Sequence, residues 1–249
     1  MTALKETATP VAATLAEIDR VIDESGYVKH SFTRSLLGGD VSSDGLRDWA
    51  VQKYFQTYEQ NRGFSAIHSI SPYEDVRQWQ MGQLIAEETT LEDGSDAHYR
   101  LMARFARAIG AQDADFDRDR MAPQVGRFID YIMSVCRDKN FVYGLLAFYV
   151  NERQTPAAAQ KMFDHLTSTL GISDHDAEWF SVHGEVDVHH SEGARKLIAK
   201  YATEAPEFET EALVVVREGI AQWQALQDFY YGVATGAIAV QTSDSGAAR

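Results

Sequence analysis

Residues 179–191, with the sequence WFSVHGEVDVHHS, contain three metal-ligand side chains at helical spacing. His183, Asp187 and His190 are separated by four and three residues, so they share one narrow face of a helix that turns ~100° per residue. Two imidazoles and one carboxylate form a ligand set suited to iron, manganese or zinc. The same spacing also fits a solvent-exposed polar face, so the interpretation depends on whether other segments supply further ligands.

The composition is that of a soluble globular protein. Of the 249 residues, 45% are hydrophobic and 24% are charged, and the net charge of -14 argues against nucleic acid or an anionic membrane as a partner. With 5 prolines and no low-complexity linker, we predict one domain at 9–240, a flexible N-terminal tail at 1–8 and a disordered C-terminal tail at 241–249. A single cysteine, no signal peptide and no membrane-spanning apolar run predict a cytoplasmic location.

Apolar residues recur at helical spacing along the whole chain, and no segment alternates for long with a period of two. Glycine-containing and proline-containing breaks separate the helical segments. We therefore predict an all-α, single-domain bundle of about seven to eight helices. In this prediction residues 42–70 form one long helix, and residues 174–201 form the helix that carries His183.

Two other parts of the chain offer further ligands. Glu152 lies among apolar and aromatic residues on the preceding helix, where a buried carboxylate needs a metal or a salt bridge, for example to Arg153. Glu88 and His98 flank a break in the helical pattern at residues 93–95. Glu87 and Glu92 compete with Glu88 for the same role, because all three precede the break.

Six side chains together offer three carboxylates and three imidazoles, which is a full ligand set for two iron ions with open positions for dioxygen. They are Glu88, His98, Glu152, His183, Asp187 and His190. Helical bundles build such sites from side chains on facing helices, although the Glu-x-x-His pair of ferritin-like proteins is absent here. A zincin motif and a glycine-rich phosphate loop are absent too.

The combination resembles the heme-oxygenase-like di-iron oxidases, which share an all-α fold with thiaminase II (TenA) and the quinone-biosynthesis oxidase PqqC. The resemblance rests on Glu152, a gap of about 30 residues and the FSVHGEVDVHHS stretch, together with the spacing of Glu88 and His98. It implies two Fe(II) per chain, dioxygen as co-substrate and an oxidase or oxygenase of biosynthesis. The substrate would be a small organic molecule derived from an amino acid, an amine or a fatty acid. Catalytic roles are implied for Glu88, Glu152 and Asp187.

Residues 152–156, ERQTP, are similar to one branch of this family, the chlamydial death-domain-associated proteins. That branch makes para-aminobenzoate from its own tyrosine and lysine. Here Asn151 stands where a tyrosine usually precedes the metal-binding glutamate, and the lysine position falls near Met162, next to Lys161. A self-sacrificing para-aminobenzoate synthase is therefore the alternative enzyme. A helical metal-binding or protein-interaction module is the non-enzymatic alternative.

A bundle-interior site also needs a substrate pocket. Aromatic residues and one lysine are the candidates for its wall, with core packing as the competing role of the aromatic side chains: Tyr54, Tyr58, Tyr149, Trp179 and Lys161. The expected partners are a small-molecule substrate, an external electron donor and a second copy of the chain in a homodimer.

Overall fold

The computed structural model describes residues 9–91 and 95–240, and every regular element within them is helical. The all-α prediction is confirmed, whereas the tails predicted at 1–8 and 241–249 lie outside the described residues. None of the described helices combines the length and the apolar character that crossing a membrane requires.

The α-helices are α1 Pro10–Ser25, α2 Ser31–Gly38, α3 Ser43–Gln60, α4 Arg62–Ile70, α5 Glu74–Glu88, α6 His98–Ala108, α7 Pro123–Asp138, α8 Phe141–Ser168, α9 Glu178–Tyr201 and α10 Phe208–Ala234. Short 3-10 helices are η1 Tyr27–Lys29, η2 Asp113–Phe116, η3 Arg118–Arg120 and η4 Ala202–Glu204.

The described part of the chain has more helices than the predicted seven to eight, partly because residues 42–70 divide into α3 and α4. The division falls at Asn61, whose buried side-chain amide donates a hydrogen bond to the Glu87 carbonyl at 3.4 Å. Helix α9 begins at Glu178, four residues later than predicted. These boundaries depend on tertiary contacts and loop geometry that a periodic pattern does not contain.

Capping side chains fix several helix starts. The Ser42 hydroxyl accepts a hydrogen bond from the Gly45 amide at 3.0 Å and begins α3. The Asn140 side chain does the same for α8 by accepting from the Val142 amide at 3.0 Å. Each cap satisfies an amide that has no partner inside its helix, so the chain turns sharply into the bundle.

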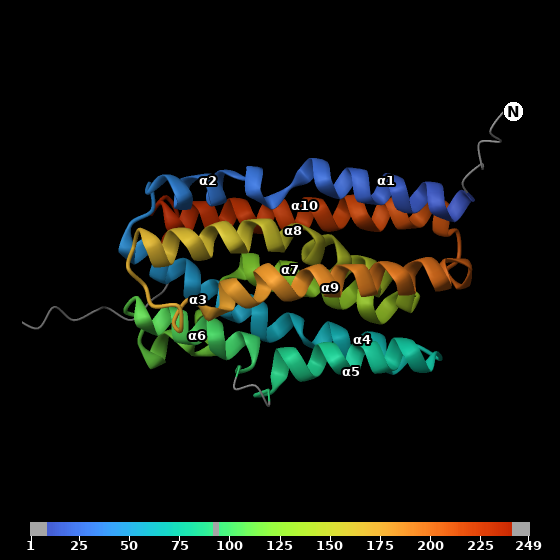
Figure 1. Cartoon of the computed structure of the whole chain (residues 1–249), viewed down its shortest axis with the longest axis horizontal. Coiled ribbons are helices and arrows are strands. Elements are labelled where there is room, and N and C mark those ends of the chain that lie inside the picture. The colour runs from blue at the N-terminus through green and yellow to red at the C-terminus, as the bar shows by residue number, and fades with distance from the viewer. Residues whose placement is uncertain (1–8, 92–94, 241–249) are drawn as a thin grey trace, which may run out of the picture.

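The long helices run side by side along the long axis of the molecule, with α8 and α9 packed together over much of their length (Figure 1). Helix α1 lies along α10 on one side, and α4 lies along α5 on the other. The first ten residues of α8, FVYGLLAFYV, are all buried. A helix that is apolar all round has to lie inside the bundle, so α8 brings Glu152, two residues further on, close to its centre.

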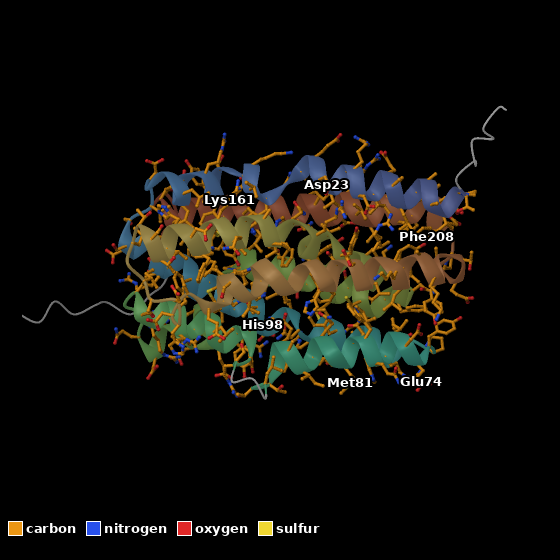
Figure 2. All side chains as sticks on the ribbon, in the orientation of Figure 1. Asp23, Glu74, Met81, His98, Lys161 and Phe208 are labelled. Atoms are coloured by element: carbon orange, nitrogen blue, oxygen red, sulfur yellow. The ribbon has the colours of Figure 1, made fainter. Side chains whose placement is uncertain are left out.

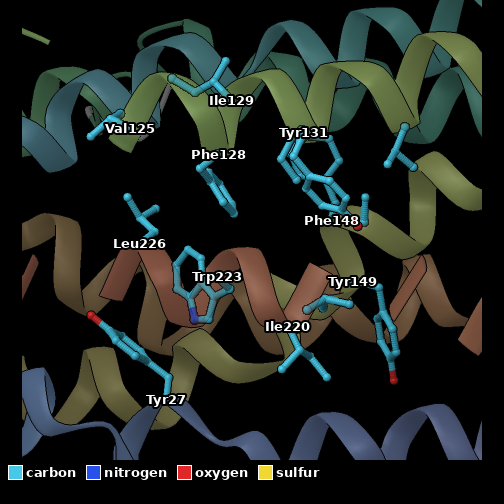
Figure 3. Packing of buried hydrophobic residues seen from close by; sticks show 14 of the residues in the cluster. Tyr27, Val125, Phe128, Ile129, Tyr131, Phe148, Tyr149, Ile220, Trp223 and Leu226 are labelled. Atoms are coloured by element: carbon cyan, nitrogen blue, oxygen red, sulfur yellow. The ribbon is translucent and has the colours of Figure 1, made fainter. Parts of the chain in front are cut away.

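Aromatic side chains fill the core where α7, α8 and α10 meet (Figure 3). The Trp223 ring packs against Phe128 with ring centroids 5.6 Å apart and edge-on against Tyr27 at 5.7 Å. Nearby, Phe64 of α4 stacks on Phe148 of α8 at 3.9 Å. Because large aromatic rings interlock in few arrangements, this packing gives the polar site a rigid wall.

Two helical glycines give a test of the packing between α3 and α10. A Cβ atom at Gly45 would lie 2.0 Å from the backbone oxygen of Ala234, whereas a Cβ at Gly82 would meet nothing within 4 Å. We expect Gly45→Ala to lower the free energy of unfolding by about 1–3 kcal/mol through overpacking against a backbone that cannot move freely. Gly82→Ala should raise it by up to about 1 kcal/mol, because alanine favours the helix. Urea denaturation measures both, and equal stabilities would contradict the close approach of these helices.

Candidate metal centre

Three buried side chains from three helices meet inside the bundle. Glu87 lies in the last turn of α5, His98 is the first residue of α6, and His183 lies in the second turn of α9. Each offers one ligand atom, and these atoms all lie within 4.8 Å of one another. The cluster therefore joins the two sides of the α5–α6 connection to α9.

Hydrogen bonds orient both imidazoles. His98 Nδ1 donates to Glu87 Oε1 at 2.9 Å, and His183 Nδ1 donates to the Trp179 carbonyl at 2.7 Å. In each ring this leaves Nε2 as the nitrogen with a lone pair. The two rings lie 4.5 Å apart, centroid to centroid, so the cluster is compact.

The electrostatics suit a cation. Burial, followed by the nearby His98 ring, lowers the pKa of His183 well below its ordinary value, so its imidazole is neutral and can act as a ligand. The second carboxylate oxygen of Glu87 is buried and has no hydrogen-bond partner in the described part of the chain. An orphaned carboxylate oxygen beside the neutral His183 imidazole is the arrangement that a divalent metal ion would satisfy, so these residues fit the metal predicted from the sequence.

The cluster faces a small cavity of about 40 Å³. Glu152 of α8 lines it together with Glu87 and His183, so a second carboxylate faces the same space. Arg153, proposed from the sequence as a salt-bridge partner of Glu152, forms an ion pair with Asp23 of α1 at 2.8 Å. The cavity wall also contains Asn151, the residue directly before Glu152.

The structure corrects the choice of Glu88. Its side chain is exposed, whereas Glu87 is buried against His98. Successive residues of a helix point ~100° apart, so only one of the two glutamates can face the interior. Glu92, the third candidate, lies outside the described residues.

The predicted face of α9 is only partly described. His183 joins the cluster, and His190, seven residues further along, is half-buried with its ring 6.2 Å from that of Trp79 on α5. His190 is not one of the three clustered residues found in the described part of the chain. The side chain of Asp187 lies outside the described residues, although its backbone belongs to α9.

Of the five predicted pocket residues, Trp179 lines the cavity and the other four do not. The Trp179 ring is buried and stacks on His183 with centroids 4.0 Å apart. Tyr149 is buried but its hydroxyl donates to Asp19 of α1 at 2.5 Å, away from the cluster. Lys161 is exposed, and Figure 2 shows it on a different side of the molecule from His98.

The remaining two tyrosines belong to another aromatic group. Tyr54 and Tyr58 stack with ring centroids 6.0 Å apart, and Tyr99 packs edge-on against both. Tyr58 is 44% exposed, so this group reaches the surface. Neither Tyr54 nor Tyr58 lines the cavity beside the metal centre.

Lys53 of α3 is a site residue that the sequence analysis missed. It is only 8% exposed and lines the cavity with Glu87 and His183. A lysine in a helix usually lies on the solvent-exposed face, so the sequence pattern did not indicate that Lys53 is buried. The available signal was the surrounding run of polar residues, Gln52, Gln56 and Thr57, on a helix whose Trp49 and Phe55 had to be buried.

Comparisons with known proteins show the family of this chain. Residues 47–224, more than half of the chain, match the sequence profile of a family described as iron-containing redox enzymes. The chain is 28% identical over 225 residues to a protein of Nitrosomonas europaea named 4-aminobenzoate synthase, covering 86% of this chain and 89% of that protein. A Chlamydia trachomatis protein with the same name is 25% identical, with 74% and 78% covered.

Solved structures show the same architecture. A protein domain from Shewanella denitrificans with a heme oxygenase-like fold superposes with a TM-score of 0.71 at 13% identity, covering 90% of this chain and 93% of that one. A TenA homologue from Pseudomonas syringae gives a TM-score of 0.74 at 11% identity, with 92% and 99% covered. The resemblance seen in the sequence is thereby confirmed: the chain has a heme-oxygenase-like fold and belongs to the family of iron-containing redox enzymes.

Proposed function

We propose that this protein is a non-heme di-iron oxygenase that uses dioxygen to form 4-aminobenzoate from side chains of its own. The observation that carries the proposal is the buried group of Glu87, His98 and His183 beside a cavity of about 40 Å³. The names of the relatives from Nitrosomonas and Chlamydia supply the product.

The ligands come from four helices. Glu87, His98 and His183 would hold one iron ion, and Glu152, which lines the same cavity, would be a further ligand. Asp187 and His190 on α9 complete the six-ligand set proposed from the sequence, with Glu87 in place of Glu88. Iron bound there would supply redox chemistry with dioxygen that amino-acid side chains lack.

The chain itself would position and shield this site. The Trp179 carbonyl fixes the His183 ring through Nδ1, and the Glu87 carboxylate fixes the His98 ring, so both Nε2 atoms are held ready for metal. Phe64, Phe148 and Trp223 line the cavity and would limit the access of water to it. A water-poor surrounding protects reactive intermediates from side reactions.

The size of the cavity favours a substrate that is part of the protein. A space of about 40 Å³ has room for water or dioxygen, whereas a cavity that binds benzene measures about 150 Å³. Two tyrosines contact residues that line the cavity. Tyr27 packs on Trp223, and the Tyr230 hydroxyl donates a hydrogen bond to Gln56 at 2.9 Å. Either could supply an aromatic ring without a binding pocket for a free substrate.

The adjacent glutamates test the metal site. Loaded anaerobically, the protein should bind about two Fe(II) per chain, and Glu87→Gln should weaken iron binding by about tenfold or more because it removes a buried charged ligand. Glu88→Gln is the matched control and should bind iron as the unchanged protein does, because Glu88 is exposed. Iron per chain after desalting measures the effect. Equal loss in the two variants, or loss in neither, would overturn the assignment of Glu87.

The product assay tests the reaction. Iron-loaded protein supplied with dioxygen and a reductant, but no organic substrate, should release 4-aminobenzoate in amounts that never exceed the amount of chains. Intact mass and peptide mapping should show a matching loss from the chain: the aromatic ring would come from Tyr27 or Tyr230, and the amino nitrogen from a lysine side chain. Tyr→Phe at the modified tyrosine should prevent the loss. His183→Ala, which removes a proposed ligand, should release none. Absence of product, or repeated turnover with an unmodified chain, would refute self-processing.

A further inference from the structure

A buried lysine lies beside the metal centre. Lys53 is 8% exposed, and its ammonium lies 5.1 Å from the ring centroid of Trp179 and 5.3 Å from that of Trp223. The charge is therefore flanked by two indole rings, each of which attracts a cation through its π-system. All three residues line the cavity that Glu87 and His183 also face.

Neighbouring side chains hold this ammonium in the cavity. Lys53 donates a hydrogen bond to Gln56 Oε1 at 3.0 Å, and the Tyr230 hydroxyl donates to the same oxygen at 2.9 Å. The Gln56 amide nitrogen donates to Gln60 Oε1 at 3.1 Å, which fixes the orientation of the Gln56 side chain. Lys53 is thus positioned by a buried network and does not extend to the surface, where lysine side chains usually lie.

The same wall contains two further donors. The indole N–H groups of Trp179 and Trp223 are buried and have no acceptor in the described part of the chain. An indole nitrogen can only donate, and a buried donor without a partner is unfavourable by about 1–3 kcal/mol. Trp49 also has an unpartnered buried N–H, but it does not line the cavity.

We propose that Lys53, Trp179 and Trp223 form a carboxylate-binding subsite on the wall of the metal-site cavity. A positive charge and two indole donors match a small anion that only accepts hydrogen bonds. The carboxylates of Glu87 and Glu152 line the same cavity and serve the metal. The inference rests on the proposed function for its biological ligand, the carboxylate group of 4-aminobenzoate, which this subsite would hold as the product forms.

Metal-free protein gives a test that does not depend on iron or on turnover. The chain has 4 tryptophans, so protein labelled with ¹⁵N-tryptophan gives a distinct indole signal for each, assigned by Trp→Phe variants. Formate, the smallest carboxylate, is the probe, and chloride at equal ionic strength is the control. We expect formate to shift the Trp179 and Trp223 signals saturably. The Trp49 signal should stay in place, because Trp49 is equally buried and outside the cavity.

A charge-removing variant completes the test. Lys53→Met should weaken formate binding by about tenfold or more, because a hydrogen bond to a charged group is lost. Lys161→Met, at an exposed lysine, should bind formate normally. Circular dichroism checks that the Lys53→Met variant folds. If the variant does not fold, the formate titration of the unchanged protein tests the subsite by itself. No saturable shift of Trp179 and Trp223, equal shifts of all the indoles, or undiminished binding in a folded Lys53→Met variant would overturn the subsite while leaving the metal centre untouched.

Discussion

A carboxylate and two imidazoles buried together tie three helices of this bundle to one another. Glu87, His98 and His183 are each less than a tenth exposed, although carboxylates rarely lie inside a protein without a partner. The hydrogen bond between Glu87 and His98 joins the end of α5 to the start of α6. The His98 ring lies 4.5 Å from the His183 ring, centroid to centroid, and this contact packs the α5–α6 connection against α9. A polar cluster that draws on three helices requires those helices to keep their register.

The apolar part of the bundle makes that cluster possible. The fully buried first ten residues of α8 and the aromatic packing around Trp223 give one rigid side of the cavity. Asn61 connects the apolar part of the bundle to the site. Its side-chain amide, between α3 and α4, donates a hydrogen bond to the backbone carbonyl of Glu87. Side chains that position a ligand are as important as the ligand itself, since imidazole and carboxylate groups bind metal only in the correct orientation.

Charges of both signs line the cavity. Acidic and imidazole groups from α5, α8 and α9 belong to its wall, and so does the Lys53 ammonium, which lies near the rings of Trp179 and Trp223. Trp179 contacts both groups, because its carbonyl holds His183 and its ring lies against Lys53. In a low-dielectric interior such fixed charges act strongly on any molecule placed between them.

The sequence alone determined the all-α class and the candidate ligand types, because helical period and local spacing are properties of neighbouring residues. It placed His98, Glu152 and His183 at one site for the same reason, since each lies on a helix with an identifiable inner face. Only the tertiary structure decided between Glu87 and Glu88, because one residue of rotation at the end of α5 depends on how that helix packs. Only the tertiary structure shows that Lys53 lines the cavity and that four of the predicted pocket residues do not: Tyr54, Tyr58, Tyr149 and Lys161. Which side chains face a cavity depends on how helices from distant parts of the chain pack together.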